Sequence, residues 1–355
     1  MRTFCQPRAA DRNASASARM HVTARILTTI FTLAACGGSH SHGPRVLVSN
    51  EKDGTVTVID ARSYAAVGTI KVGKRPRGLH VSPDGRWLYV ALSGSPIGGP
   101  GVDEASLPPP NHGEDGIGVV DLDAMKLVRS ISSGEDPESF DLVDDHTIVV
   151  SNEETAQASV VDLKTREIER TIAIGREPEG VAHAPDHTAW VTSEGDAKIY
   201  VVDPKAGTVL ATIPTGARPR AIAFANDKAY ITNENDGTLT VANIAKRTVQ
   251  ATIALPASGS AGKPRPMGLA VADHRIYVSE GRARSVAVLD TSTDEVTKTI
   301  ADVGARPWGI AVAPNGLVFT ANGPSNDVSV IDPRTDRVVQ HIPTGASPWG
   351  IAIAP

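Results

Sequence analysis

The feature that most constrains the fold is a short phrase, G-x-x-P-x-G followed by an apolar residue, which recurs along the chain. Its prolines stand at positions 76, 137, 178, 219, 266, 307 and 348, so the gaps between them are 61, 41, 41, 47, 41 and 41 residues. A fixed period of this length is typical of repeat architectures, in which each copy is one supersecondary unit. We therefore expect seven equivalent units in a single domain.

Each period contains four short apolar stretches separated by turn residues, which predicts four antiparallel strands. In the last full copy these strands are expected at residues 309–313, 317–320, 328–332 and 337–342, where β-branched residues dominate. The third stretch of every copy ends in an acid or amide, whose short side chain can bond the backbone of the following turn. These turn residues are Asp60, Asp121, Asp162, Asp203, Asn243, Asp290 and Asp332.

Seven four-stranded units arranged radially make a seven-bladed β-propeller, an all-β fold with only short, protected sheet edges. The repeats begin with a second strand at residues 45–50 and end with a first strand at residues 350–354. Neither strand completes a blade alone. We therefore predict one propeller domain over residues 45–355, closed by pairing of its N- and C-terminal strands.

The N-terminus has a different composition, with five arginines before an apolar run at residues 26–35. A basic segment, a short apolar run and small residues are typical of a secretory signal, and ten residues are too few to span a bilayer. Leu33, Ala34, Ala35 and Cys36 resemble the bacterial lipobox, whose cysteine is acylated and becomes the first mature residue. The alternative is an ordinary signal peptide with an incidental cysteine.

This reading predicts a signal peptide over residues 1–36, a linker over 37–44 and an exported lipoprotein of the bacterial cell envelope. The protein would lie on the periplasmic face or at the outer membrane, and would contact the membrane through the lipid alone. Both Met1 and Met20 can serve as the start, since residues 20–36 already form a complete signal. The membrane leaflet is left open.

Composition excludes several classes of function. The chain has only two cysteines, Cys5 and Cys36, so the predicted mature body has no disulfide, thiolate metal site or cysteine nucleophile. A net charge of −5 argues against binding nucleic acid through bulk charge. The sequence has no G-x-S-x-G elbow, phosphate loop or H-E-x-x-H motif. We expect a monomer without a nucleic-acid partner, and the sequence favours a binding protein over an enzyme.

Two groups of residues carry a family resemblance. Tyr230-Ile-Thr-Asn233, and the segment 48–50 with the T-V-T-V-I-D stretch at 55–60, resemble the YVTN-type β-propeller repeat. The resemblance covers residues 45–355 and implies a propeller that is exported; the family has no single activity. Segments 134–139 and 148–153 are also similar to propellers associated with PQQ-dependent periplasmic catabolism, which implies an accessory role in quinoprotein oxidation.

The long connections fall on one face of the predicted propeller. Because successive strands alternate in direction, loops from a fourth to the next first strand share a face with loops from a second to a third strand. We call this the top face. Both extra-long connections, at residues 93–116 and 256–262, lie on it. Long loops on one face of a repeat scaffold usually mark its binding face.

The residues on either side of the repeated proline differ from copy to copy, while the glycines and proline recur. A concave rim that mixes arginine, acid and aromatic anchors is what a recognition site requires. We therefore predict that the top face binds a periplasmic or envelope protein, or a small molecule, without a cofactor or catalysis. The predicted site residues are Arg75, Arg77, Glu138, Glu179, Arg218, Arg220, Trp308 and Trp349. The competing interpretation is solvated loop charges, with both tryptophans packed on proline.

A second set of polar residues follows the second strands. These are the pairs Asn50-Glu51, Asn152-Glu153, Ser193-Glu194, Asn233-Glu234 and Ser279-Glu280. Converging oxygens suit Ca²⁺, which takes six to eight oxygen ligands. This possible calcium site, with Asn152, Glu153, Asn233 and Glu234 as ligands, would make the protein a hydrolase resembling calcium-dependent propeller lactonases. The competing interpretation is that each asparagine only caps the following turn.

His80 and Asp141 occupy matching places in neighbouring copies where other copies carry alanine. An imidazole–carboxylate pair suits acid–base work, although a buried structural pair explains the same pattern. His112 in the long connection is a further candidate.

Overall fold

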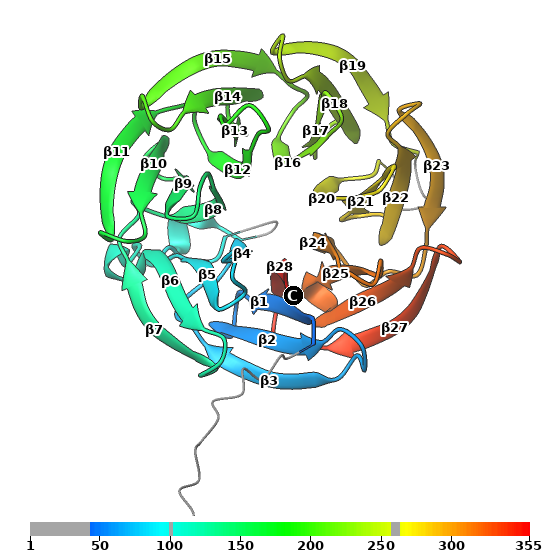
Figure 1. The fold of residues 1–355 in the computed structure, drawn as a ribbon, viewed down its shortest axis with the longest axis horizontal. Coiled ribbons are helices and arrows are strands. Elements are labelled where there is room, and N and C mark those ends of the chain that lie inside the picture. Colours follow the sequence, from blue (N-terminus) through cyan, green and yellow to red (C-terminus); the bar gives the residue numbers. More distant parts are fainter. Residues whose placement is uncertain (1–42, 99–101, 257–262) are drawn as a thin grey trace, which may run out of the picture. The chain divides into compact units, whose positions relative to one another are not determined.

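The 41-residue period folds into seven four-stranded antiparallel sheets that follow one another around an axis (Figure 1). The structure is a computed structural model that describes residues 43–98, 102–256 and 263–355. The predicted seven-bladed propeller is therefore confirmed. The predicted signal peptide, Cys36 and most of the linker lie outside the described residues, as does most of the connection 256–262. Within the described residues no helix has the length and apolarity to cross a membrane.

Each blade runs from an inner strand to an outer strand in chain order, except blade 1, which takes its inner strand from the C-terminus. The inner strands of blades 1 to 7 are β28 (Pro348–Ala354), β4 (Leu79–Val81), β8 (Pro137–Leu142), β12 (Pro178–His183), β16 (Pro219–Ala225), β20 (Pro266–Ala272) and β24 (Pro307–Val312). The second strands are β1 (Arg45–Asn50), β5 (Trp87–Leu92), β9 (Thr147–Asn152), β13 (Ala189–Ser193), β17 (Lys228–Asn233), β21 (Arg275–Glu280) and β25 (Val318–Asn322).

The third strands are β2 (Thr55–Asp60), β6 (Gly116–Asp121), β10 (Gln157–Asp162), β14 (Lys198–Asp203), β18 (Thr238–Asn243), β22 (Ser285–Asp290) and β26 (Asp327–Asp332). The outer strands are β3 (Ala66–Lys71), β7 (Lys126–Ile131), β11 (Glu167–Ala173), β15 (Thr208–Pro214), β19 (Thr248–Ala254), β23 (Glu295–Ile300) and β27 (Arg337–Pro343). Short 3-10 turns lie at η1 (Glu104–Ser106), η2 (His112–Glu114) and η4 (Gly323–Ser325).

The ring closes as the sequence predicted. Strand β28 pairs antiparallel with β1, which brings Arg45 opposite Ala354 and Leu47 opposite Ala352. The apolar clusters straddle neighbouring blades; one contains Leu47 of blade 1 together with Leu88 and Val90 of blade 2. Because burial occurs between blades, no blade completes its core without both neighbours.

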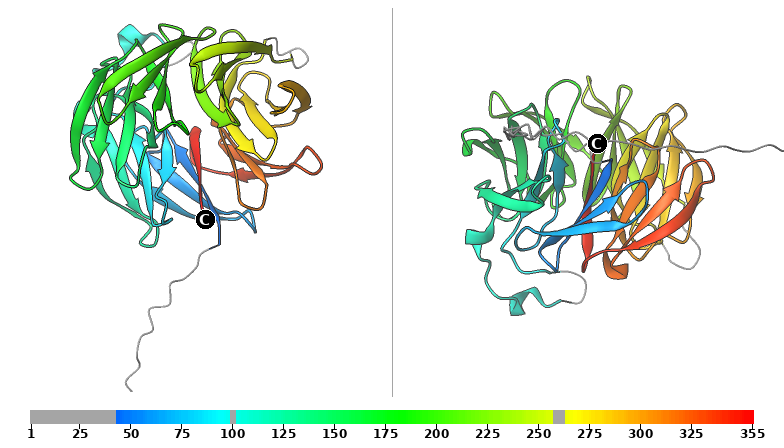
Figure 2. Two further views of the ribbon diagram at one scale, coloured as in Figure 1. Left: turned by 45° about the horizontal axis from the view of Figure 1, so that its top comes forward. Right: turned by 60° about the horizontal axis from the view of Figure 1, so that its bottom comes forward.

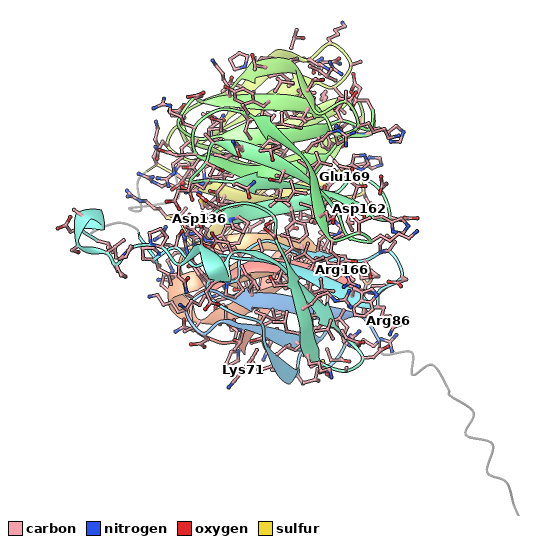
Figure 3. The ribbon with its side chains drawn as sticks, turned by 90° about the vertical axis from the view of Figure 1, so that its left-hand side faces the viewer. Lys71, Arg86, Asp136, Asp162, Arg166 and Glu169 are labelled. Carbon is pink, nitrogen blue, oxygen red and sulfur yellow. The ribbon has the colours of Figure 1, made fainter. Side chains whose placement is uncertain are left out.

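The acids that end the third strands form turns, as predicted. In blade 1, Asp60 Oδ1 accepts hydrogen bonds from the backbone N–H groups of Arg62 (3.0 Å) and Ser63 (2.7 Å). The equivalent Asp162 accepts from Lys164 and Thr165 in the same way. These turns lie on the face opposite the predicted site: Asp162 and Arg86 lie toward one side of the ring, while Asp136 lies on the other (Figure 3).

The glycine after P-x explains how neighbouring blades join. A Cβ at Gly350 would lie 2.4 Å from the carbonyl oxygen of Arg77, and one at Gly180 would lie 2.0 Å from that of Arg220. The same carbonyls accept hydrogen bonds from hydroxyls on the second strands, as from Ser49 to Arg77 (2.8 Å). This bond recurs at four further junctions: Ser151 to Glu179, Thr192 to Arg220, Thr232 to Met267 and Ser279 to Trp308. The repeat therefore holds the backbone of these five variable residues in place.

The strand register corrects one part of the sequence reading. Pro219 lies opposite Asn233 in blade 5, whereas its counterpart Pro266 lies opposite Glu280 in blade 6. Glu280 therefore occupies the asparagine place, and Gly281 occupies the place of the acid. Aligning Ser279-Glu280 with Asn-Glu was wrong by one residue, a slip that puts a side chain on the other face of a strand.

Candidate binding site

A cavity with a volume of about 1230 Å³ opens where the inner strands begin. Its lining includes the residue before the repeated proline in six blades and the residue after it in five. The connection between β5 and β6, here called the arm (residues 93–115, described over 93–98 and 102–115), projects from the ring (Figure 2), and its residues Ile97 and Leu107 also line the cavity. The connections of the top face thus meet at one cavity, as the strand directions predicted.

The backbone before each proline has an unusual conformation. Five of these residues that carry large or charged side chains have positive φ angles between 45° and 60°: Arg75, Asp136, Glu177, Arg218 and Arg306. Residues other than glycine adopt this left-handed backbone conformation only at a cost of about 1 kcal/mol or more. Because the conformation recurs from blade to blade, it belongs to the repeat, and it presents the pre-proline side chains at the cavity.

On blades 1 to 3, two arginines cross-link the acids of neighbouring blades. Arg75 contacts Glu51 (Nε–Oε1, 3.3 Å) and Asp136 (Nη1–Oδ1, 3.1 Å), and Arg77 contacts Glu51 (Nε–Oε1, 2.9 Å) and Glu138. The side chain of Arg75 is 9% exposed and that of Glu138 is fully buried. Burial raises the pKa of Glu51, but Arg77 and Arg75 outweigh it and lower that pKa. These side chains are not solvated loop charges.

On blades 4 and 5, Arg220 is the centre of the network. Its guanidinium lies 2.8 Å from Glu179, 2.5 Å from Glu194 and 2.9 Å from Glu234. Burial alone would lower the pKa of Arg220, but these three carboxylates raise it above its usual value. Arg218 adds a contact of 2.7 Å to Glu194.

Two acids in this region have strongly raised pKa values. Burial, together with repulsion from Glu179, raises the pKa of Glu153 to about 7 and that of Glu194 to about 8. Glu194 contacts two arginines, whereas Glu153 has no ion-pair partner within 4 Å among the described residues. The contacts therefore favour Glu153 as the carboxyl that retains a proton near neutral pH. Carboxyls with pKa values raised in this way can act as proton donors.

The tryptophans lie side by side, with the ring centroids of Trp308 and Trp349 5.7 Å apart. Arginines cover both rings: the guanidinium of Arg77 lies 5.6 Å from Trp349, and those of Arg220 and Arg306 lie 5.8 and 5.0 Å from Trp308. Such cation–π contacts stabilise both partners. The aromatic side of the cavity is therefore continuous with its charged side.

The structure thus brings the eight predicted residues together around one site. Arg75, Arg77, Glu179, Arg218, Arg220 and Trp308 line the cavity, while Glu138 and Trp349 contact residues that do. That they bind a ligand stays a prediction. Sequence reasoning missed the role of the acids after the second strands: Glu51, Glu194 and Glu234 pair with the arginines, whereas Glu153 has no ion-pair partner among the described residues. The recurrence of these acids in four copies was visible in the sequence. Only the strand register and the burial of the side chains reveal which residues they contact.

The residues of the predicted calcium site are held in different ways. Asn152 and Asn233 are fully buried, and their amides donate to Ser159 (2.8 Å) and Thr240 (2.9 Å) inside their own blades. Glu234 is engaged by arginines, whereas Glu153 lines the cavity. Among the described residues one group could also hold a metal, since ligand oxygens of Asp136, Glu138 and Glu153 lie within 4.8 Å of one another. Arg75 already neutralises part of this group, and calcium stays a prediction.

His80 and Asp141 form a pair on neighbouring inner strands, with Nε2 2.9 Å from Oδ1. The other ring nitrogen of His80 lies 3.0 Å from the carbonyl oxygen of Val81. Burial alone would lower the pKa of His80, but the carboxylate of Asp141 raises it. A protonated ring can donate to both acceptors, which leaves no free nitrogen to act as a base. This geometry favours the structural interpretation of the pair.

His112 lies at the base of the arm rather than in the cavity lining. Its Nδ1 lies 2.9 Å from Asp115 Oδ2, and hydrogen bonding to Asp115 raises the pKa of His112. Asp115 also accepts the backbone N–H groups of Gly94 (2.6 Å) and Asp136 (3.1 Å). Asp115 therefore ties the two ends of the arm to each other and to blade 3, and His112 contacts this acid.

Comparison with known proteins agrees with this architecture. The family described as "Domain of unknown function (DUF5074)" matches residues 215–349, which run from blade 5 to the start of β28. No curated protein matches the sequence.

Solved structures extend the similarity to almost the whole propeller. A periplasmic gluconolactonase from Pseudomonas aeruginosa has 20% identity and a TM-score of 0.70 over 88% of this chain and 99% of its own. A putative 6-phosphogluconolactonase from Bacteroides fragilis has 16% identity and a TM-score of 0.70 over 89% and 99%. Hydrazine synthase from Kuenenia stuttgartiensis has 20% identity and a TM-score of 0.66 over 80% and 91%. At these identities the similarity establishes the fold.

Proposed function

We propose that this chain is an exported, lipid-anchored propeller of the bacterial cell envelope that binds a small ligand, or a loop of a partner protein, in the cavity of the top face. One observation carries the proposal: side chains that differ between blades converge on one cavity of about 1230 Å³. Ligand pockets commonly measure roughly 300–1,000 Å³ and combine apolar walls with a few fixed polar groups. The pairing of Arg77 and Arg220 with buried acids preorganises these groups, which lowers the entropic cost of binding.

Replacing Trp308 with alanine tests the proposal, because this ring lines the cavity. Wild-type and variant proteins are immobilised and incubated with envelope extract, and both retained proteins and eluted small molecules are identified. We expect at least one species to be lost with the variant. Trp87→Ala is the matched control, since Trp87 also carries an arginine over its ring (4.7 Å) but does not line the cavity. An identical set of retained species in all three samples contradicts the proposal.

A lactonase-like hydrolase is the second candidate function. It is supported by the fold shared with a periplasmic gluconolactonase and a putative 6-phosphogluconolactonase, and by the raised pKa of Glu153, which suits a general acid. Gluconolactone turnover is measured with and without a calcium chelator, for the wild type and for Glu153→Gln. Hydrolysis equal to the uncatalysed rate excludes this candidate.

Two further expectations remain proposals with their own tests. Cys36→Ser should abolish acyl labelling of the exported protein, and persistence of the label would refute the lipid anchor. An accessory role in quinoprotein oxidation rests on the sequence resemblance. Co-purification with a quinoprotein or cytochrome would support it, and failure to co-purify under crosslinking would count against it.

A further inference from the structure

The ring of acids around the cavity is incomplete. In four blades the acid after the second strand donates its backbone N–H to the carbonyl before the repeated proline: Glu51 to Ser347, Glu153 to Asp136, Glu194 to Glu177 and Glu234 to Arg218. In blades 6 and 7 glycines make the same bond, Gly281 to Arg265 (2.7 Å) and Gly323 to Arg306 (3.3 Å). Two adjacent blades therefore have the backbone of the acid position without its carboxylate.

The arginines remain where the carboxylates are missing. Arg265 keeps one carboxylate contact, to Glu234 at 3.2 Å. Arg282 and Arg306 line the cavity, but neither has a carboxylate within 4 Å among the described side chains. By contrast, Arg220 contacts three carboxylates.

The charge around Arg306 is correspondingly unbalanced. Burial lowers the pKa of Arg306, and the neighbouring guanidinium groups of Arg220, Arg282 and Arg265 act in the same direction, against the single carboxylate of Glu234. Positive charges in a concave, partly desolvated site attract an anion more strongly than isolated surface charges do. This part of the cavity therefore has an excess of positive charge.

Blade 5 shows how a carboxylate fits between such arginines. Glu234 contacts Arg218 of its own blade (3.3 Å) and Arg265 of the next blade (3.2 Å). By the repeat, a carboxylate at the place left open by Gly281 would lie between Arg265 and Arg306. A Cβ on Gly281 would lie 3.3 Å from Met267 Cγ and 3.4 Å from the carbonyl oxygen of Arg265, so a side chain fits there once the flexible side chain of Met267 shifts slightly.

We infer that the cavity binds an organic anion whose carboxylate takes the place of the missing acid at Gly281, between Arg265 and Arg306, with its apolar body against Met267 and Trp308. Arg–carboxylate pairs favour a planar, two-pronged geometry, which both arginines can offer. The apolar wall comes from the residues after proline in blades 6 and 7, which carry Met267 and Trp308 where blades 2 to 5 carry charges. This inference rests on the proposed ligand-binding function and names the class of ligand.

The test uses benzoate, a carboxylate on a flat apolar ring, and benzamide as its neutral counterpart. Binding to the full chain is followed by tryptophan fluorescence at constant ionic strength. We expect benzoate to bind the wild type at least about tenfold more tightly than benzamide, as charge-assisted hydrogen bonds imply. Arg306→Gln should remove this preference. Arg86→Gln, a change at an arginine that covers a tryptophan outside the cavity, should leave it unchanged.

The sharpest variant restores the missing carboxylate. Gly281→Glu should occupy the site from within the protein and abolish benzoate binding, whereas Gly281→Gln fills the same volume without charge. We expect the glutamate variant to bind benzoate at least about tenfold more weakly than the glutamine variant. Thermal unfolding of both variants controls for misfolding. Equal binding of benzoate and benzamide, or equal loss in both Gly281 variants, overturns the inference.

The two proposals fail in distinguishable ways. If Trp308→Ala still loses a molecule from envelope extract but Arg306→Gln does not affect benzoate, the cavity binds a ligand that is not held by this carboxylate contact. If benzoate binds as expected but no envelope species depends on Trp308, the charge arrangement is correct and the proposed function is wrong.

Discussion

Glu280 is a fully buried carboxyl at the end of β21, and replacing it with glutamine measures what its burial costs the fold. Its carboxylate accepts a hydrogen bond from Ser285 Oγ (2.6 Å). Four other blades carry asparagine in the same place. Its amide donates to a hydroxyl of the third strand that lies five or seven residues later in the sequence. Glutamine keeps the shape of Glu280 and removes its charge at every pH.

The magnitude follows from the pKa. Burial raises the pKa of Glu280 from 4.5 to about 7, although the hydrogen bond from Ser285 opposes the change. Between these values the folded state holds a proton that the unfolded chain releases, so the free energy of unfolding falls as the pH rises through this window. The loss amounts to about 3 kcal/mol once the carboxyl is ionised in both states. Below pH 4.5 it is absent.

We therefore expect Glu280→Gln to resemble the wild type at pH 4.5 and to be more stable by about 3 kcal/mol at pH 9. For a domain of this size that corresponds to roughly 5 °C in melting temperature. Unfolding is followed by circular dichroism across the pH range. Glu295→Gln, at an exposed acid in the same blade, is the control. If the difference between Glu280→Gln and the wild type is the same at both pH values, Glu280 is not a buried acid with a raised pKa.

Three further predictions concern the frame of the ring. Ending the chain at Thr344 removes β28 and should abolish cooperative unfolding, as seen by circular dichroism; a normal transition would show that closure is dispensable. Gly350→Ala puts a Cβ against the Arg77 carbonyl and should cost about 2 kcal/mol or more in urea denaturation, whereas Gly316→Ala, with no atom within 4 Å, should cost only its backbone strain. Arg220→Met removes the arginine that contacts Glu179, Glu194 and Glu234, which leaves Glu179 without an ion-pair partner among the described residues and the other two acids with fewer partners. The variant should lose about 3–5 kcal/mol at pH 8 and less at pH 5, where protonation relieves the acids; a loss independent of pH would contradict this assignment.

The sequence was sufficient to predict the architecture, because the same strand and turn pattern recurs in seven copies. The predicted strand at residues 337–342 appears as Arg337–Pro343, and that at 350–354 lies within Pro348–Ala354. Strand direction alone placed the arm on the face that carries the cavity, as its described residues Ile97 and Leu107 show. These inferences depend on period and alternation, which local sequence encodes directly.

The site was less accessible because charges far apart in sequence neutralise one another. Arg220 was predicted as a site residue and Glu194 as one of the acids after the second strands, but only the folded ring shows that these two side chains lie 2.5 Å apart and largely shielded from solvent. Glu280 was wrongly assigned for a related reason. The sequence analysis grouped it with the acids after the second strands, but its strand register places it at the preceding position, which asparagine occupies in blade 5. Gly281 occupies the position that holds an acid in other blades. The sequence alone does not reveal this, because it becomes evident only when the register of β20 and β21 is known.

The hydrogen bonds that link neighbouring blades have a consequence for how such a site can change. At five junctions a hydroxyl, such as that of Ser49, donates a hydrogen bond to the carbonyl oxygen of the residue after proline. This bond does not involve the side chain of that residue. Arginine, glutamate, methionine and tryptophan all satisfy this requirement equally, because each supplies the same backbone atom. The fold thus separates stability from recognition at these positions. New specificity can arise there by single substitutions, provided that any buried charge acquires a partner.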